Sequence, residues 1–352
     1  PFATLPRAQQ AVRALVAKGL PPGGVVVNVA AGEYRLTESL AFTAADSGTA
    51  AAPVVWRAQS KGQAILTGGQ RLPAPQAVTD PAILARLPEA ARGKVMQVDL
   101  RAAGITQYDD PQPRGFGRGK SMPVMELFSD GQPLRLARWP NSGFLTSGKV
   151  ISNDEKGGVF AFADERLARW SAAQDPWTLG YWGYLWAEQR DPVRVDAAAG
   201  TVTIRDKVTY GGLNPGMPFY FYNLLEEIDE PGEWYLDRET GKLYLYPLDP
   251  KAELKLSLLD TPLVTANAAS WVILDGLTLE YGRWHGAQLT DCEHCLLAGC
   301  TVRNVGGEGA IIEGGKNDGL FGCDLYNLGR GNKITGGDRK TLAPGGHFIE
   351  NC

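Results

Sequence analysis

The sequence of 352 residues predicts an all-β protein whose main part is a parallel β-helix, a solenoid of stacked coils. Three observations predict this fold. First, Gly276, Gly299 and Gly322 recur at a constant step of 23 residues, and a period in the twenties is typical of solenoids. Second, a short apolar run precedes each of these glycines, bounded by turn residues and too short for a helix. Third, the position after each glycine holds leucine or cysteine, which predicts an apolar column inside the stack.

The predicted inner column contains Leu277, Cys300 and Cys323, and Cys352 follows at the same position after a longer coil. Free cysteine behaves as a small buried hydrophobe, so these thiols fit the interior. A leucine-rich repeat has a similar period, but it requires a denser leucine ladder and a helical segment in each repeat. The sequence shows neither of these features and therefore favours the β-helix.

A polar column is predicted beside the apolar one. It consists of Asn304, Asn327 and Asn351, although Asn351 is out of phase with the other two. Asparagine in a stacked turn bonds to its own backbone and to the next coil. We therefore expect side-chain hydrogen bonds between neighbouring coils.

The first 70 residues predict a helix followed by less regular coils. Residues 5–18 have an apolar stripe, with Thr4 as N-cap and Pro6 in the first turn. This helix is expected to cap the open end of the solenoid, whose first strands otherwise expose unpaired edges. The expected strands lie at residues 25–29, 32–36, 40–42, 54–56 and 64–66.

Residues 71–255 interrupt the period and predict an inserted antiparallel β domain resembling a sandwich. Asp130-Gly131 between apolar runs indicates a hairpin, and residues 234–246 alternate on both sides of a second turn. Several tryptophans and tyrosines crowd residues 170–186, where they form either a core or platforms for sugar rings; the core is favoured. The chain returns to the helix at residues 256–352, and we expect coils to continue beyond Cys352 because a solenoid needs a capped end.

Several motifs in this order resemble a known group of proteins. They are the opening Pro1-Phe-Ala-Thr-Leu5, Gly32-Glu-Tyr-Arg-Leu36, Asp46-Ser-Gly-Thr-Ala50, Leu66-Thr-Gly-Gly69 and the stretch from Gly331 to Asn351. The sequence resembles bacterial right-handed parallel β-helix proteins of carbohydrate metabolism, namely glycoside hydrolases of the β-xylosidase or fucosidase/xylanase type. The resemblance implies a right-handed β-helix with a domain inserted between early coils. It does not identify the reaction, because lyases, hydrolases and epimerases share this scaffold.

Composition and charge restrict the partners. The net charge of −4 does not favour a polyanion such as nucleic acid, and no apolar run reaches the length of a membrane span. The chain shows no signal peptide, so we expect either that a precursor was trimmed or that the sequence was cut from a longer one, and we expect an extracellular or periplasmic location. The expected partner is a polysaccharide or oligosaccharide substrate, and the expected state is a monomer.

No metal or other cofactor is expected. Cys292 and Cys295 form a C-x2-C pair, but a zinc site needs a second pair nearby, so structural thiols are favoured. The acidic run at residues 226–230 leaves calcium as an alternative to a solvated turn.

Hydrolysis of a sugar bond requires two carboxyl groups that face one groove. Because 285 and 308 differ by one period, His285 and Glu308 are expected to stack as a proton-handling pair. Glu313 and Asp338 are the further acids that we expect nearby, although solvated turns often hold acids. Four substrate-binding residues are also expected: Trp284 as a stacking platform, Arg283, Arg339 and Asn332.

The sequence leaves three functions open. A secreted glycoside hydrolase acting on plant or microbial polysaccharide is favoured. A polysaccharide lyase needs a basic residue and neutralisation of a uronate, and the arginines fit that chemistry. A non-catalytic carbohydrate-binding scaffold is the third.

Overall fold

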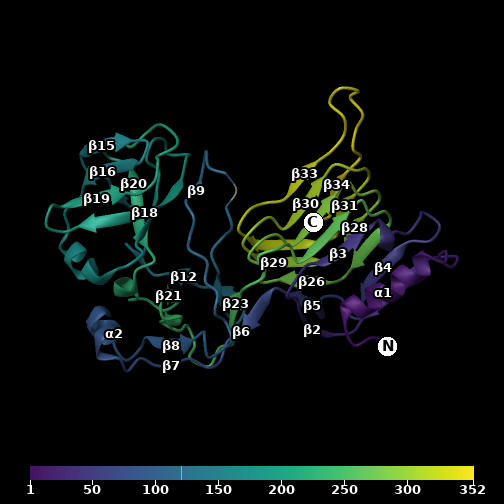
Figure 1. The fold of residues 1–352 in the computed structure, drawn as a ribbon, viewed down its shortest axis with the longest axis horizontal. Coiled ribbons are helices and arrows are strands. Elements are labelled where there is room, and N and C mark those ends of the chain that lie inside the picture. Colours follow the sequence, from purple (N-terminus) through teal and green to yellow (C-terminus); the bar gives the residue numbers. More distant parts are fainter. Residues whose placement is uncertain (120) are drawn as a thin grey trace. The chain divides into compact units, whose positions relative to one another are not determined.

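The computed structural model describes residues 1–119 and 121–352, which form two compact units (Figure 1). Unit 1 contains residues 1–70, 123–126 and 255–352, and unit 2 contains residues 71–122 and 127–254. The chain leaves unit 1 in β6 (Gly69–Arg71) and returns in β23 (Leu254–Ser257). The sequence assigned residues 71–255 to one insertion, whereas the short segment 123–126 belongs to unit 1.

Unit 1 is built from three parallel sheets, which we name A, B and C. Sheet A contains β1 (Val25–Val29), β4 (Val54–Ala58), β25 (Val272–Asp275), β28 (Leu296–Ala298), β31 (Gly319–Phe321) and β34 (Phe348–Glu350). Sheet B contains β2 (Gly32–Arg35), β5 (Ala64–Thr67), β26 (Thr278–Glu280), β29 (Thr301–Val305) and β32 (Asp324–Leu328). Sheet C contains β3 (Leu40–Thr43), β24 (Val264–Asn267), β27 (Ala287–Thr290), β30 (Ala310–Glu313) and β33 (Lys333–Thr335).

The order of the strands explains the repeat. From β25 onward the chain passes through sheets A, B and C in rotation, so each repeat contributes one strand to each sheet. Leu297 pairs with Leu320 in sheet A, and Val302 pairs with Leu325 in sheet B. Each partner lies one period further along the chain, as the sequence predicted.

From β25 onward, the turn between a strand of sheet A and the next strand of sheet B is two residues long, and its first residue has a left-handed backbone conformation. Gly276, Gly299 and Gly322 have φ angles of 70°, 56° and 61°, a conformation that glycine adopts without steric cost. Asn351 follows β34 with φ 54° and takes the same place. Its assignment to the column of Asn304 and Asn327 is therefore wrong, because Asn351 belongs to a different turn.

The polar column of Asn304 and Asn327 is confirmed. Both residues lie near the ends of β29 and β32 and have a left-handed backbone conformation, with φ angles of 54° and 51°. The Nδ2 of Asn327 donates a hydrogen bond of 3.1 Å to Oδ1 of Asn304. The two side chains thus link consecutive repeats at the point where the chain leaves sheet B.

The apolar core of unit 1 lies among the three sheets and includes the predicted thiol column. Cys300 and Cys323 are each 1% exposed. The Cys323 Sγ contacts the carbonyl oxygen of Leu297 at 3.3 Å, and its backbone N–H donates to Cys352 Sγ at 3.4 Å. All five cysteines are free, and Cys352 is exposed.

This burial predicts the reactivity of the thiols. In the native protein, Cys300 and Cys323 should resist alkylation by a small maleimide, because a reagent cannot reach them without local unfolding. Cys352 should react at once and serves as the internal control. Mass mapping of labelled peptides would contradict the inner column if both buried thiols were modified as fast as Cys352.

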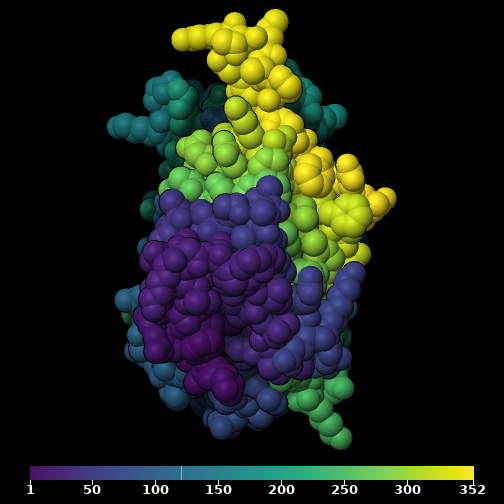
Figure 2. Space-filling view, turned by 90° about the vertical axis from the view of Figure 1, so that its right-hand side faces the viewer, coloured from purple at the N-terminus to yellow at the C-terminus, as the bar shows by residue number. Residues whose placement is uncertain are grey.

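Helix α1 (Leu5–Val16) begins at the predicted N-cap. Thr4 Oγ1 accepts from the backbone N–H of Arg7 at 3.4 Å. Leu5, Ala8 and Val12 are buried in the core cluster of unit 1. Arg13 Nε donates to Oδ1 of Asp46 at 2.8 Å. Asp46 belongs to the short 3-10 helix η1 (Ala44–Asp46). Figure 2 shows this N-terminal segment in purple on the face turned toward the viewer.

Unit 2 contains two larger sheets. The five-stranded sheet is formed by β12 (Arg135–Leu136), β21 (Glu233–Asp237), β22 (Lys242–Leu245), β8 (Met96–Asp99) and β7 (Gln76–Ala77). The nine-stranded sheet is formed by β13 (Arg138–Trp139), β20 (Pro218–Tyr222), β17 (Trp177–Gly180), β18 (Gln189–Asp196), β19 (Thr201–Ile204), β16 (Gly157–Ala161) and β15 (Val150–Asp154), with β14 (Leu145–Thr146) and β9 (Arg114–Gly115) at its sides. The remaining elements are α2 (Pro81–Arg86), η2 (Glu89–Ala91), η3 (Glu165–Ala172) and η4 (Leu225–Glu227).

The two predicted hairpins of unit 2 are present. Strands β10 (Leu127–Ser129) and β11 (Gln132–Pro133) pair across Asp130-Gly131, both with positive φ, and β21 pairs with β22. Each of the two larger sheets has its own apolar cluster. Across the described residues, no helix combines the length and apolar character that crossing a membrane requires.

The acidic run at residues 226–230 pairs with arginines. Arg86 Nε donates to Glu226 Oε1 at 2.8 Å, and Arg166 Nη1 donates to Glu227 Oε2 at 2.6 Å. Within residues 1–119 and 121–352, no group of three or more His, Cys, Asp or Glu side chains is placed to hold a metal ion.

Candidate active site

The candidate site lies in the turns that join sheet B to sheet C, which we call the B–C turns. They are residues 281–286, 306–309 and 329–332, and each is rich in glycine. Backbone hydrogen bonds hold them in a stack: Gly306 N–H donates to Gly282 O at 2.9 Å, and Gly286 N–H donates to Glu308 O at 3.0 Å. Side chains one period apart therefore lie side by side.

His285 and Glu308 are in contact across this stack, which confirms their predicted stacking. The imidazole Nδ1 lies 2.9 Å from Glu308 Oε2, and the two side chains are 3% and 9% exposed. The same Nδ1 lies 3.1 Å from the backbone N of Glu308. A ring nitrogen either donates or accepts, so the position of one proton decides which of these two contacts is made.

Trp284 and Arg330 extend the cluster. The Trp284 ring lies 4.2 Å from the His285 ring, between centroids. Arg330 Cζ lies 5.8 Å from the centroid of the Trp284 ring, and Arg330 Nη1 lies 4.0 Å from Glu308 Oε1. We therefore place Arg330 at the site. The sequence had left this arginine open as a ligand of a uronate carboxylate but favoured a surface charge, although its position two periods after Trp284 was a signal.

Two glycines leave the space that this arrangement needs. A Cβ on Gly307 would lie 2.5 Å from His285 Nδ1. A Cβ on Gly306 would lie 3.0 Å from Pro123 Cβ and 3.3 Å from Glu126 Oε2. Glu126 is thus a further carboxyl group at the B–C turns, and sequence reasoning missed it because it comes from a segment far away in the chain.

Arg283 holds this segment in place. The arginine is 6% exposed, and its Nε and Nη2 donate to the Pro123 carbonyl oxygen at 3.3 and 3.0 Å. The Glu126 backbone N–H donates to Ser257 Oγ at 2.8 Å, which anchors the same segment. A guanidinium so engaged positions residues 123–126 and is not placed to meet a substrate.

The other predicted site residues are divided between two turns. Asn332 lies in the B–C turn that stacks on residues 306–309, and its Oδ1 accepts from Ala310 N–H at 2.9 Å. Glu313 ends β30, at the opposite end of that strand from Glu308, and pairs with Lys333.

Asp338 and Arg339 lie in the loop of residues 336–347 between β33 and β34, which projects from the sheets (Figures 1 and 2). Asp338 accepts from Lys340 N–H at 2.8 Å and Thr341 Oγ1 at 2.9 Å, and these bonds lower its pKa. The predicted grouping of Asp338 with Glu308 is wrong, because this loop follows sheet C, whereas Glu308 precedes it.

A second charged row on sheet B shows the contrast with Glu308. Glu280, 2% exposed, accepts from Nε of Arg303 and contacts its Nη2, both at 2.7 Å from Oε2. Arg303 Nη1 also donates to the Tyr326 hydroxyl at 3.1 Å. Burial lowers the pKa of Arg303, but its contacts with Tyr326 and Glu280 outweigh that effect and raise the pKa. The partner of Glu280 is thus an arginine, which is always charged, whereas the partner of Glu308 is a histidine.

Comparison with solved structures agrees with this architecture. The chain is similar to a protein described as a glycoside hydrolase, with a TM-score of 0.61 and 16% sequence identity, over 94% of this chain and 70% of that one. It also aligns with the complex of XylC with xylose, at a TM-score of 0.31 and 10% identity, over 99% of this chain and 53% of that one. No family model and no curated protein matches the sequence. At 16% identity, the first comparison shows a shared fold.

Proposed function

We propose that the protein is a glycoside hydrolase that cleaves a plant or microbial polysaccharide or oligosaccharide at the B–C turns. The observation that carries the proposal is the buried contact between His285 Nδ1 and Glu308 Oε2. A carboxyl group held in place beside an imidazole offers the pair of proton-handling groups that general acid–base catalysis uses. The fold shared with a glycoside hydrolase is consistent with this chemistry.

In this proposal the fold is a closed right-handed parallel β-helix, with α1 as the cap of its first repeat. The three parallel sheets visited in rotation and the burial of Leu5, Ala8 and Val12 in one core support it. The protein is proposed to be secreted by a bacterium and to act as a monomer on its sugar substrate.

The proposed reaction uses Glu308 as the acid that protonates the glycosidic oxygen. When Glu308 is protonated, a neutral His285 ring accepts from the Glu308 backbone N–H. After Glu308 has given up its proton, uptake of a second proton from solvent on Nδ1 of His285 would place a charged imidazolium 2.9 Å from Glu308 Oε2. The imidazole can thus stabilise the ionised acid after proton transfer.

Glycosidases require a second carboxylate, which attacks the sugar or activates water. Glu126 is the candidate for this role, because it reaches the Gly306 turn from a different segment. Arg330 and Asn332 are proposed to bind substrate hydroxyl groups beside Glu308, and Trp284 is proposed to stack on a sugar ring.

The alternative is a polysaccharide lyase acting on a uronate. Arg330, 34% exposed, approaches the same site and offers a cation for a substrate carboxylate. The test is mass spectrometry of the products from neutral and uronate polymers in ¹⁸O-labelled water. A hydrolase incorporates one labelled oxygen for each bond cleaved. Products with a new double bond and no label would show a lyase, and binding without turnover would show a scaffold.

Trp284→Ala is expected to raise the KM of a hydrolysed substrate by about fivefold to tenfold with little change in kcat. The indole contributes ring contact to a bound sugar, and aromatic contacts contribute about 0.5–1.5 kcal/mol beyond area burial. Steady-state kinetics would measure the effect. Trp271→Ala is the matched control, since Trp271 also lies against a histidine ring, with 4.1 Å between the ring centroids of Trp271 and His294, but it precedes β25. An equal effect of the two substitutions would contradict a role for Trp284 in substrate binding.

A further inference from the structure

Unit 2 carries a cluster of exposed rings, which we call the aromatic surface. It consists of Phe116, Tyr184, Trp186 and Tyr210, which are 45%, 47%, 58% and 45% exposed. Tyr184 and Trp186 stack at 5.2 Å with an angle of 11° between their planes. Phe116 meets Trp186 edge-on at 4.8 Å and Tyr210 at 5.1 Å. Four large rings that contact one another and remain this exposed mark a binding surface.

These rings differ from the other aromatic residues in the same stretch of sequence. Trp170, Trp177 and Trp182 are 4%, 3% and 0% exposed, as a core interpretation predicts. Tyr184 and Trp186 follow directly in the chain but point into solvent. Their exposure is therefore a local feature of this surface and does not reflect loose packing of the region.

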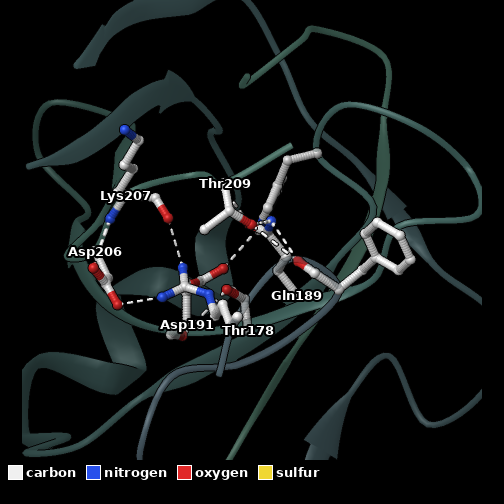
Figure 3. Close-up of polar contacts among 9 residues, drawn as sticks. Thr178, Gln189, Asp191, Asp206, Lys207 and Thr209 are labelled. Carbon is white, nitrogen blue, oxygen red and sulfur yellow. Dashed lines mark hydrogen bonds and ion pairs between the residues drawn. The ribbon is translucent and has the colours of Figure 1, made fainter. Parts of the chain in front are cut away.

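Three segments that carry the rings are joined by hydrogen bonds close beneath them. The Phe116 backbone N–H donates to Glu188 O at 2.8 Å, and Thr209 Oγ1 donates to Phe116 O at 3.0 Å. Gln189 Nε2 donates to Thr209, which completes the link between the segments (Figure 3). A Cβ on Gly183 would lie 2.0 Å from Tyr210 O, so the segments that carry Tyr184 and Tyr210 are in close contact.

A charge network that contains the buried Asp191 fixes the same segments. Arg118 donates to both Asp191 and Asp206 and to the Lys207 carbonyl oxygen (Figure 3). Asp191 is 0% exposed and also accepts from Trp182 Nε1 at 3.0 Å. Because the segments are already ordered, a ligand that binds the rings would lose little affinity to ordering them.

The charges around the rings select the class of ligand. Arg118 is engaged by two carboxylates, Lys207 pairs with Glu155, and Arg190 lies 3.6 Å from Glu188. These cations are matched by acids, whereas binding to a polyanion requires an excess of positive charge. Flat rings edged by tyrosine hydroxyls suit a neutral ligand with an apolar face and hydroxyl groups, which describes a sugar ring.

We propose that the aromatic surface of unit 2 is a non-catalytic binding surface for a neutral polysaccharide chain. The proposal rests on the proposed function only in the choice of polysaccharide as the polymer. The aromatic surface includes none of the residues of the B–C turns. Its role is to hold the polymer by ring stacking, independently of bond cleavage.

The experiment measures binding of the full chain to insoluble xylan and to cellulose, with polygalacturonate as the charged polymer. Trp186→Ala and Tyr210→Ala should each weaken binding to at least one neutral polymer by about tenfold. Turnover of a short soluble oligosaccharide should not change. Phe321→Ala, which removes a ring that is 44% exposed in unit 1, is the matched control and should bind as wild type. Circular dichroism would confirm that the variants fold.

Each outcome decides the proposal separately from the proposed function. If the wild type turns over no substrate but binds a neutral polymer, and the variants lose this binding, the binding surface is supported and the proposed hydrolase activity is contradicted. Wild-type affinity in both variants, or binding only to polygalacturonate, would overturn the surface whatever the turnover. Sedimentation velocity provides a further test: self-association of wild type that Trp186→Ala abolishes, without any effect on polymer binding, would show an interface between copies and overturn the proposal.

Discussion

Glu308→Gln is expected to lower kcat/KM on a cleavable substrate by about 10²–10⁴-fold, the range that general acid–base catalysis contributes. Glutamine has nearly the shape of glutamate but has no proton to transfer to a leaving oxygen. Its amide oxygen can accept from His285 Nδ1 when that nitrogen carries a proton, and the backbone N–H of residue 308 can donate to Nδ1 when it does not. The variant should therefore remain folded and bind substrate while turnover is lost, as steady-state kinetics and binding measurements would show.

Two matched substitutions test whether the loss of turnover is specific to Glu308 or follows the removal of any carboxylate from unit 1. Glu313→Gln removes a carboxylate at the far end of β30, and Asp338→Asn removes one in the loop before β34. Both should keep close to wild-type turnover. Full activity of Glu308→Gln, or equal loss in all three variants, would exclude the His285–Glu308 pair as the acid.

Cys323→Asp is expected to produce the largest loss of stability, about 3–5 kcal/mol in the free energy of unfolding, the range for an uncompensated buried charge. Cys323 is 1% exposed, and its Sγ faces the carbonyl oxygens of Leu297 and Phe321 at 3.3 and 3.6 Å. An aspartate there would set a carboxylate against two acceptors inside an apolar core. Equilibrium unfolding in urea would measure the change.

Cys352→Asp is the control for that substitution. It makes the same chemical change at the corresponding turn position, but Cys352 is exposed. Its effect should stay within about 0.5 kcal/mol, as for ordinary surface substitutions. Similar losses in both variants would mean that Cys323 does not lie in a tightly packed interior.

The sequence could predict those features that depend on the constant period. His285 and Glu308 are one period apart, and parallel pairing places residues one period apart on neighbouring strands. The expectation for Asp338 did not rest on the period, because this residue lies in the irregular loop that lengthens the step to 29 residues between Cys323 and Cys352. A period specifies which residues stack, but it does not specify where a long loop projects.

Other features depend on contacts that no local pattern contains. Glu126 reaches the B–C turns because Arg283 binds the Pro123 carbonyl, an interaction across 160 residues of sequence. The exposure of Trp186 beside the buried Trp182 also follows from the packing of distant segments. Composition shows that this stretch is aromatic, but it does not show which rings face solvent.

The three kinds of turn differ in how much extra chain they accept, and this sets where the protein can acquire new parts. From β25 onward, the turn from sheet A to sheet B is two residues with a left-handed first residue, so its length is restricted by backbone geometry. The step from sheet B to sheet C accommodates the whole of unit 2 after β5, and the step from sheet C to sheet A accommodates residues 336–347. The two large insertions therefore lie at two of the three corners, whereas the turns from sheet A to sheet B stay short, with five residues between β4 and β5 and two from β25 onward. A guest peptide grafted into residues 336–347 should leave the register of the neighbouring strands intact, whereas one inserted at Gly299-Cys300 would disrupt the stack.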